Sequence, residues 1–70
     1  MEYNFFNNRI KELREEKGLS QRELANKTGI KQANISRWEA GLVVPNIIDI
    51  WTLAEFFDCS IDYLVGKEIF

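Results

Sequence analysis

The segment Gln21–Ala40, QRELANKTGIKQANISRWEA, places narrow limits on how this chain can fold. Ala25 is followed four positions later by Gly29, and Ile35 comes six positions after that. Two helices that cross at a steep angle need a small side chain at the crossing, a turn residue that tolerates positive φ, and an apolar residue pointing back into the crossing. Gly adopts positive φ without a Cβ penalty. The spacing therefore predicts two short helices joined by a tight turn.

The remaining chain is predicted to be helical as well, with stop and start signals between the helices. Asn4 is a plausible cap of the first helix, Ser20 and Glu23 fit a capping box before the second, and Asn46 and Ser60 can cap the last two. Helices are expected over residues 5–17, 21–28, 32–40, 47–57 and 61–65. The inner face of the fourth is expected to consist of Ile47, Ile50, Leu53, Ala54 and Phe57. No strand pattern is visible, so the fold class is all-α, a compact five-helix bundle forming a single domain over residues 1–70.

Composition excludes several classes of protein. Seventy residues suffice for one small domain, and no apolar run approaches the ~20 residues of a membrane span. The chain contains no histidine and a single cysteine, Cys59, which argues against a zinc site and an internal disulfide. No metal or cofactor is therefore expected. Cys59 is read as a buried small apolar residue in a cytoplasmic protein.

The charge is unevenly distributed along the chain. The net charge is −2, but residues 1–45 carry eight Lys/Arg against six Asp/Glu, whereas residues 46–70 carry one against five. Phosphate contact is electrostatic, so a basic excess in the first half suits an interaction with nucleic acid. The excess is small, which predicts weak non-specific affinity and a need for two copies.

The chain resembles the Cro and phage-repressor type of helix-turn-helix proteins, the xenobiotic-response-element family. The resemblance covers residues 9–66 and rests on RIKELREEKGLSQRELANKTGIKQANISRWEAG, on Pro45 and on LAEFFDCSIDYLVG. It implies a lambda-repressor-like bundle whose helix 32–40 enters the major groove of a double-stranded DNA operator, usually to repress transcription in a prokaryotic or phage setting. In such docking the first residues of the recognition helix reach the bases.

The candidate DNA contacts lie on and beside this recognition helix. Base contacts are expected from Gln32, Ala33, Asn34 and Arg37, which combine amide, methyl and guanidinium groups suited to base edges. Phosphate contacts are expected from Gln21, Arg22 and Lys31, with Arg9 and Lys27 as weaker candidates. The resemblance further implies that Gln21 braces Gln32.

Arg14 and Glu39 are expected to pair. Glu39 lies near the end of the recognition helix, where the helix dipole disfavours a carboxylate, which suggests a nearby cation. The resemblance assigns that cation to Arg14. The hypothesis is a partly buried, structural ion pair that ties the first helix to the recognition helix.

The chain departs from the resemblance between Gly41 and Pro45. The resemblance implies basic or polar residues there, but this chain has three apolar residues, which would be exposed on a loop. One interpretation is an extended small core, and the other is a homodimer contact. The candidate dimer residues are Leu42, Val43, Val44, Ile48, Trp51 and Tyr63.

Two further function classes compete with an operator-binding regulator. The acidic second half and the apolar loop fit a protein-interaction module, such as an antitoxin or anti-repressor with a second protein partner and weak DNA binding. An enzyme is disfavoured, because the chain has no histidine, no nucleophile motif and no phosphate-binding loop.

Overall fold

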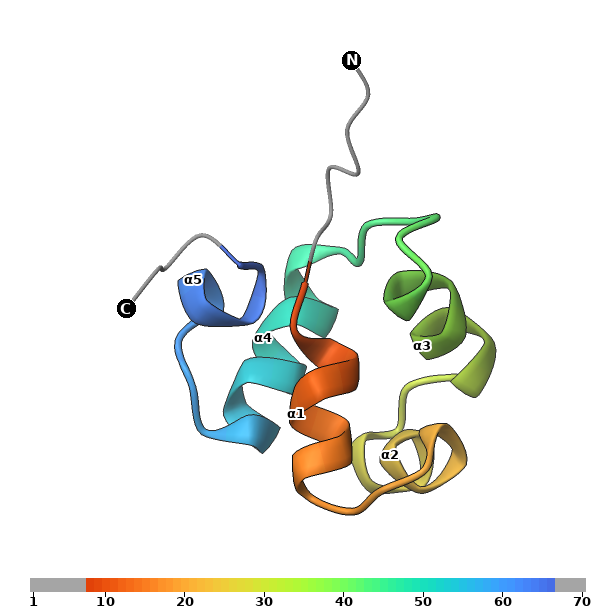
Figure 1. Ribbon diagram of the computed structural model, residues 1–70. Helices are drawn as coiled ribbons and strands as arrows, with labels where there is room; N and C mark the ends of the chain where they lie inside the picture. Colours follow the sequence, from red (N-terminus) through yellow and green to blue (C-terminus); the bar gives the residue numbers. More distant parts are fainter. Residues whose placement is uncertain (1–7, 67–70) are drawn as a thin grey trace.

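Five helices follow one another in the computed structural model, which describes residues 8–66 (Figure 1). They are α1 (Ile10–Glu16), α2 (Gln21–Thr28), α3 (Gln32–Glu39), α4 (Ile47–Phe57) and α5 (Ile61–Leu64). No strand occurs between residues 8 and 66. The predicted all-α, five-helix fold is confirmed.

Side-chain caps explain why three of the helices begin where they do. Ser20 Oγ accepts from the backbone N–H of Glu23 at 3.0 Å, and Glu23 Oε1 accepts from the N–H of Ser20 at 2.8 Å. This is the reciprocal capping box that the sequence predicts. The side chains of Asn46 and Ser60 cap α4 and α5 by single bonds, accepting from Asp49 N–H and Tyr63 N–H. The polar caps therefore fix the starts of α2, α4 and α5.

The expected start of the first helix at residue 5 is wrong, because α1 begins at Ile10. The proposed cap Asn4 lies outside the described residues. Asn8 Oδ1 accepts from the N–H of Ile10 at 2.9 Å, a local bond by which asparagine favours a turn over a helix. Asn8 also donates from Nδ2 to the carbonyl of Trp38 at 3.0 Å, which ties the entry of α1 to the end of α3.

Three helices end one residue earlier than expected. Lys17, Ala40 and Val65 cap the C-termini of α1, α3 and α5 instead of forming their last helical residues. A shift of this size is within the ordinary uncertainty of a helix boundary. It changes none of the side chains that α3 presents.

The core lies where the helices meet. α2 and α3 pack on each other, α1 packs against α3, α2 against α4, and α4 against α5. In Figure 1, α2 and α3 stand on one side of α1, while α4 and α5 stand on the other. The buried apolar residues are Ile10, Leu13, Leu24, Ile30, Ile35, Trp38, Ile50, Leu53, Ala54, Phe57 and Leu64.

The expected inner face of α4 needs one correction. Ile50, Leu53, Ala54 and Phe57 are buried, but Ile47 is 63% exposed. Ile47 directly follows the cap Asn46, and burial on α4 begins one turn later, at Ile50. Periodicity gives the direction of a side chain but not how far the neighbouring helices reach along α4. Within residues 8–66 no helix has the length and hydropathy to cross a membrane.

Candidate nucleic-acid interface

The back of α3 is anchored by apolar side chains. Ile35 and Trp38 are buried, as are Leu24 on α2 and Ile30 in the turn. Gly29 ends α2 with φ 79°, in the left-handed region that favours glycine. A Cβ on Gly29 would meet no atom within 4 Å, so the backbone angle, and not crowding, is what favours glycine here. The turn and the anchored back together fix which side of α3 faces solvent.

The solvent side of α3 carries the predicted base-contacting residues. Gln32, Ala33 and Arg37 are exposed, and Asn34 is half-buried. Asn34 and Arg37 are three residues apart on the helix, and Arg37 Nη1 donates to Asn34 Oδ1 at 3.4 Å. This distance is long for a hydrogen bond, so both side chains can exchange it for contacts with a ligand. The amide, methyl and guanidinium groups form one polar face, with an apolar back behind it.

Two of the predicted phosphate-contacting residues lie beside this face. Arg22 and Lys31 are exposed and border a shallow hollow between α2 and α3. The hollow is lined by Arg22, Ala25, Asn26, Gly29, Ile30, Lys31 and Gln32. Asn26 is a residue of this hollow that the sequence pattern did not predict. Its position four residues after Arg22 places it on the same side of α2, which is the signal that could have found it.

Gln21 has a different partner from the one expected. Instead of bracing Gln32, its Nε2 donates to Glu39 Oε1 at 3.0 Å. Gln21 is half-buried and is the first residue of α2, whereas Glu39 is the last residue of α3. The bond therefore joins the start of α2 to the far end of α3.

Arg14 and Glu39 form the expected ion pair. Arg14 Nε donates to Glu39 Oε2 at 2.7 Å and Nη2 donates to Oε1 at 3.0 Å, with 10% and 6% of the two side chains exposed. Arg14 Nη1 also donates to the carbonyl of Leu19 at 2.8 Å. The hydrogen bond to Glu39, opposed by burial and supported by the Glu39 charge, raises the pKa of Arg14 above its ordinary value. Arg14 is therefore charged at every ordinary pH.

Arg9, a weaker phosphate candidate, is engaged at another junction. Its guanidinium carbon lies 4.1 Å from the centre of the Tyr63 ring, and its Nη1 donates to the Tyr63 carbonyl. Arg9, the residue directly before α1, is thus connected to α5. Its position supports the bundle and does not extend the α2–α3 face.

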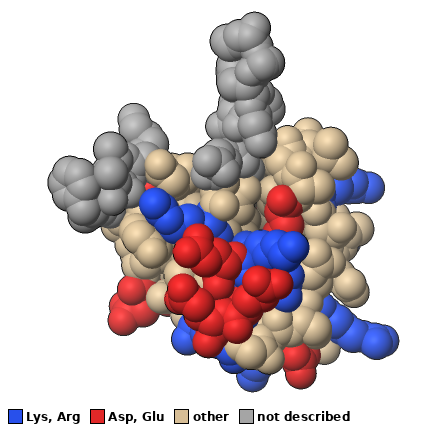
Figure 2. Space-filling view, viewed as in Figure 1, with Lys and Arg blue, Asp and Glu red and all other residues tan. Residues whose placement is uncertain are grey.

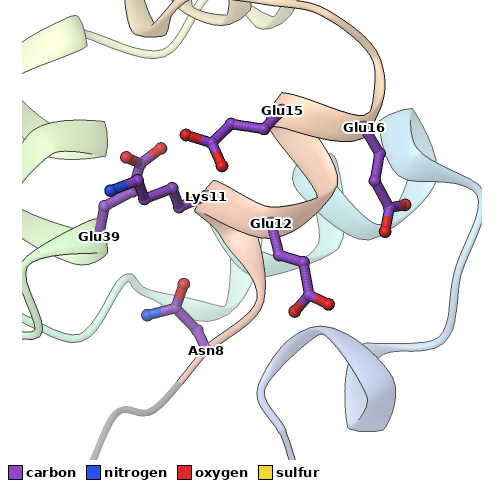
Figure 3. A pocket seen from close by; sticks show the side chains of 6 residues that line it. All are labelled: Asn8, Lys11, Glu12, Glu15, Glu16 and Glu39. Atoms are coloured by element: carbon purple, nitrogen blue, oxygen red, sulfur yellow. The ribbon is translucent and has the colours of Figure 1, made fainter.

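A second hollow, over α1, is acidic. It is lined by Asn8, Lys11, Glu12, Glu15, Glu16 and Glu39, and Figure 3 shows Glu39 approaching from α3 while the other glutamates extend from α1. In Figure 2 red side chains gather over α1, whereas blue ones project at the side formed by α2 and α3. Acidic groups repel phosphate, so this distribution favours α2 and α3 as the nucleic-acid face. No cluster of three or more His, Cys, Asp or Glu residues in the described part of the chain is arranged to hold a metal.

The predicted dimer residues divide into two groups. Leu42, Val43, Val44, Ile48 and Trp51 are exposed, Leu42 to 73%, and exposed Ile47 adjoins them in the chain. We call these six residues the apolar surface. Tyr63 is half-buried, packs on the core and lies beneath Arg9, so it does not share their exposure. Cys59 is partly buried against the core, close to the expectation of a small buried apolar residue.

An anchored α2–turn–α3 unit with a polar outer face defines a helix-turn-helix domain. The chain belongs to the helix-turn-helix family, whose model matches residues 10–64. DNA-binding transcription regulation is the function class of this family, which is not enzymatic. The predicted family and the prediction that the chain is not an enzyme are both confirmed.

Two curated relatives and one solved structure are similar to this chain. It is 35% identical over 63 residues to the HTH-type transcriptional activator BcrR of Enterococcus faecalis, covering 90% of this chain and 31% of that protein. It is 35% identical over 60 residues to the HTH-type transcriptional regulator ImmR of Bacillus subtilis (strain 168), covering 86% of this chain and 47% of that protein.

The structural relative is an HTH_3 family transcriptional regulator from Vibrio cholerae. Its TM-score is 0.74 at 28% identity, covering 93% of this chain and 36% of that one. The chain therefore spans less than half the length of each relative.

Proposed function

We propose that this chain binds double-stranded DNA sequence-specifically, with α3 in the major groove. The observation that carries the proposal is the outer face of α3, where exposed Gln32, Ala33 and Arg37 project from a helix whose back is buried. Gln32 is suited to adenine, Ala33 to a thymine methyl and Arg37 to guanine. Asn34 completes the base-reading set.

Phosphate contacts flank this reading face in the proposal. Arg22 and Lys31 border the hollow between α2 and α3, and Gln21 stands at the start of α2, where backbone N–H groups favour an anion. Such contacts position the protein without specifying sequence. Two formal charges give limited affinity, so a single copy is expected to bind DNA weakly.

The proposed active species is a homodimer formed through the apolar surface. Six large apolar side chains are exposed on one loop and on the first turns of α4. Single exposed apolar residues are common on protein surfaces, but a group of this size usually marks an interaction site. A twofold pair presents the same surface from both copies and places two copies of α3 about 34 Å apart, one turn of DNA. The dimer thereby supplies the affinity that two phosphate-contacting charges per copy lack.

The proposed regulatory effect is repression, exerted on DNA in a prokaryotic cytoplasm. A domain that covers an operator within a promoter excludes polymerase without needing any further activity. BcrR is named as a transcriptional activator. Whether this chain represses or activates transcription is therefore tested directly. A reporter behind the bound promoter is expected to fall when the chain is expressed, and a rise would assign activation.

The DNA-binding proposal is tested by selection from random DNA at a stated salt concentration. We expect one enriched motif of two half-sites related by a twofold axis, with half-sites about 10 base pairs apart. Enrichment of no motif, with equal binding to all duplexes, would contradict base reading by α3.

The dimer is tested by sedimentation of the chain alone and with the selected duplex. We expect a second copy on the apolar surface at micromolar concentration, strengthened by DNA. A stoichiometric complex with another protein on this surface would instead favour an antitoxin or anti-repressor. A monomer in both conditions would contradict the dimer.

A further inference from the structure

The Glu39 carboxylate is a meeting point of three helices. It accepts from Arg14 Nε and Nη2 on α1 and from Gln21 Nε2 on α2, while itself ending α3. Its side chain is 6% exposed, and the pair is held in place by the third nitrogen of Arg14 on the Leu19 carbonyl. The carboxylate therefore has little freedom to move.

This fixed carboxylate determines the orientation of the Gln21 amide. An ionised carboxylate only accepts hydrogen bonds, so the NH₂ group of Gln21, and not its oxygen, must face Glu39. The amide keeps a second N–H, which has no partner among residues 8–66. Phosphate oxygens also only accept, so this second N–H is the group with which the side chain can meet a DNA backbone.

We propose that Glu39, held by Arg14, is a positioning residue for DNA binding: it presets the Gln21 side chain to donate to a phosphate. The inference rests on the proposed function and adds to it a role for two residues that never touch DNA. A long side chain loses rotamer entropy when it is ordered, and ordering it beforehand removes that cost from binding. The unpaired backbone N–H groups in the first turn of α2 favour an anion at the same end of the helix.

The first test needs no DNA. In a heteronuclear NMR spectrum of the free chain, the side-chain amide protons of Gln21 are expected to exchange with solvent more slowly than those of Gln32. Gln32 is the matched control, because it is an exposed glutamine at the corresponding first position of α3. Equal exchange for the two amides would overturn the presetting of Gln21.

The second test uses the duplex selected by the wild-type chain. Gln21→Met is expected to weaken binding about ten- to a hundredfold, the effect of losing one hydrogen bond to a charged phosphate. The double variant Arg14→Met, Glu39→Leu leaves Gln21 no acceptor and is expected to bind DNA more weakly than the wild type. Adding Gln21→Met to this double variant is expected to weaken binding less than twofold further. A single methylphosphonate at the contacted phosphate is expected to abolish the effect of Gln21→Met in the wild type.

Glu39→Gln separates positioning from mere stabilisation. It keeps an oxygen for Gln21 but breaks the ion pair, so it is expected to melt below the apolar double variant, which leaves no charge unpaired. DNA affinity is expected in the opposite order, with Glu39→Gln binding more tightly than the apolar double variant. In the Glu39→Gln background, adding Gln21→Met is still expected to weaken binding. If affinity instead follows melting temperature, or if Gln21→Met costs the same factor in every background, the positioning role is wrong.

These outcomes differ from failure of the proposed function. A wild-type chain that binds no duplex contradicts DNA binding itself. Binding that stays specific while the double variant keeps the full Gln21 effect contradicts only the positioning role. Circular dichroism at the assay temperature establishes that each variant is folded when it is compared.

Discussion

The two ends of α3 lead to surfaces of opposite chemistry. Its first turns expose Gln32, Ala33 and Arg37, whereas the loop after its end exposes Leu42, Val43 and Val44. Polar tips are stable in water and need only a rigid support. Large apolar groups in water are unfavourable and lose that cost when another surface covers them. One surface is therefore complete in a single copy, whereas the other is the surface on which we propose that a second copy docks.

The largest expected effect tests the support beneath the polar surface. Arg14→Ala leaves the Glu39 carboxylate buried without its cation, so the free energy of unfolding is expected to fall by about 3–5 kcal/mol. Thermal and urea denaturation measure it. Arg22→Ala, which removes an exposed arginine, is the control and is expected to change stability by less than about 0.5 kcal/mol.

An unchanged melting midpoint for Arg14→Ala would refute the structural role of the pair. The pair is expected to be insensitive to deprotonation of Arg14 at ordinary pH. The pKa of Arg14 is raised in the folded chain. The stabilisation that Arg14 contributes is therefore complete at any pH below its pKa in the unfolded chain, and it is lost only as the pH rises through its higher pKa in the folded chain.

The next effect tests the apolar surface. Trp51 is exposed, and its indole N–H donates to Glu55 Oε2 at 3.2 Å, which holds the ring outward. Trp51→Ala is expected to weaken dimerisation by about 2–4 kcal/mol, as for a central aromatic at an interface. Sedimentation equilibrium measures this. Thr52→Ala, at the next position of α4, is the control, and similar losses in both variants would argue against a Trp51-centred interface.

A smaller effect tests base reading by the polar surface. Gln32→Ala is expected to weaken specific binding by about 1–3 kcal/mol and to relax the preference at one base pair. Lys31→Ala is expected to weaken all duplexes alike and to lower the salt slope by about one. Fluorescence anisotropy titrations measure these affinities. If Gln32→Ala lowered the affinity for specific and random DNA by the same factor, the assignment of Gln32 as a base contact would be contradicted.

The smallest effect concerns the start of α2. Ser20→Ala removes the acceptor for Glu23 N–H and is expected to lower the free energy of unfolding by about 1 kcal/mol. Ser36→Ala, an exposed serine within α3, is the matched control and is expected to be neutral or slightly stabilising. A loss for Ser36→Ala as large as for Ser20→Ala would mean that capping is not the cause.

Local signals predicted most of the fold. The S-x-x-E pattern at Ser20 encodes its own hydrogen bonds, so the start of α2 was predictable from four residues. The start of α1 was missed, because the Asn8 side chain serves both Ile10 and the distant Trp38 carbonyl. Ile47 was misplaced for a related reason: its exposure depends on where neighbouring helices end and not on its own periodicity.

The candidate site was only partly predictable from sequence. The exposure of Gln32, Ala33 and Arg37 follows from the burial of Ile35 and Trp38 on the other side of the same helix. The bond from Gln21 to Glu39 joins residues 18 positions apart and depends on the angle between α2 and α3. No spacing rule specifies that bond, so the sequence pointed to Gln21 but not to its partner.

The guanidinium of Arg14 has a consequence for which substitutions this domain can accept. Its three nitrogens are used at once, two on Glu39 and one on the Leu19 carbonyl. A lysine carries the same charge on one nitrogen and lacks the flat fork that reaches acceptors on two sides. Charge alone would thus leave the Leu19 carbonyl without its side-chain donor, and a search for distant versions of this domain should weigh the shape of the cation at this position as well as its sign.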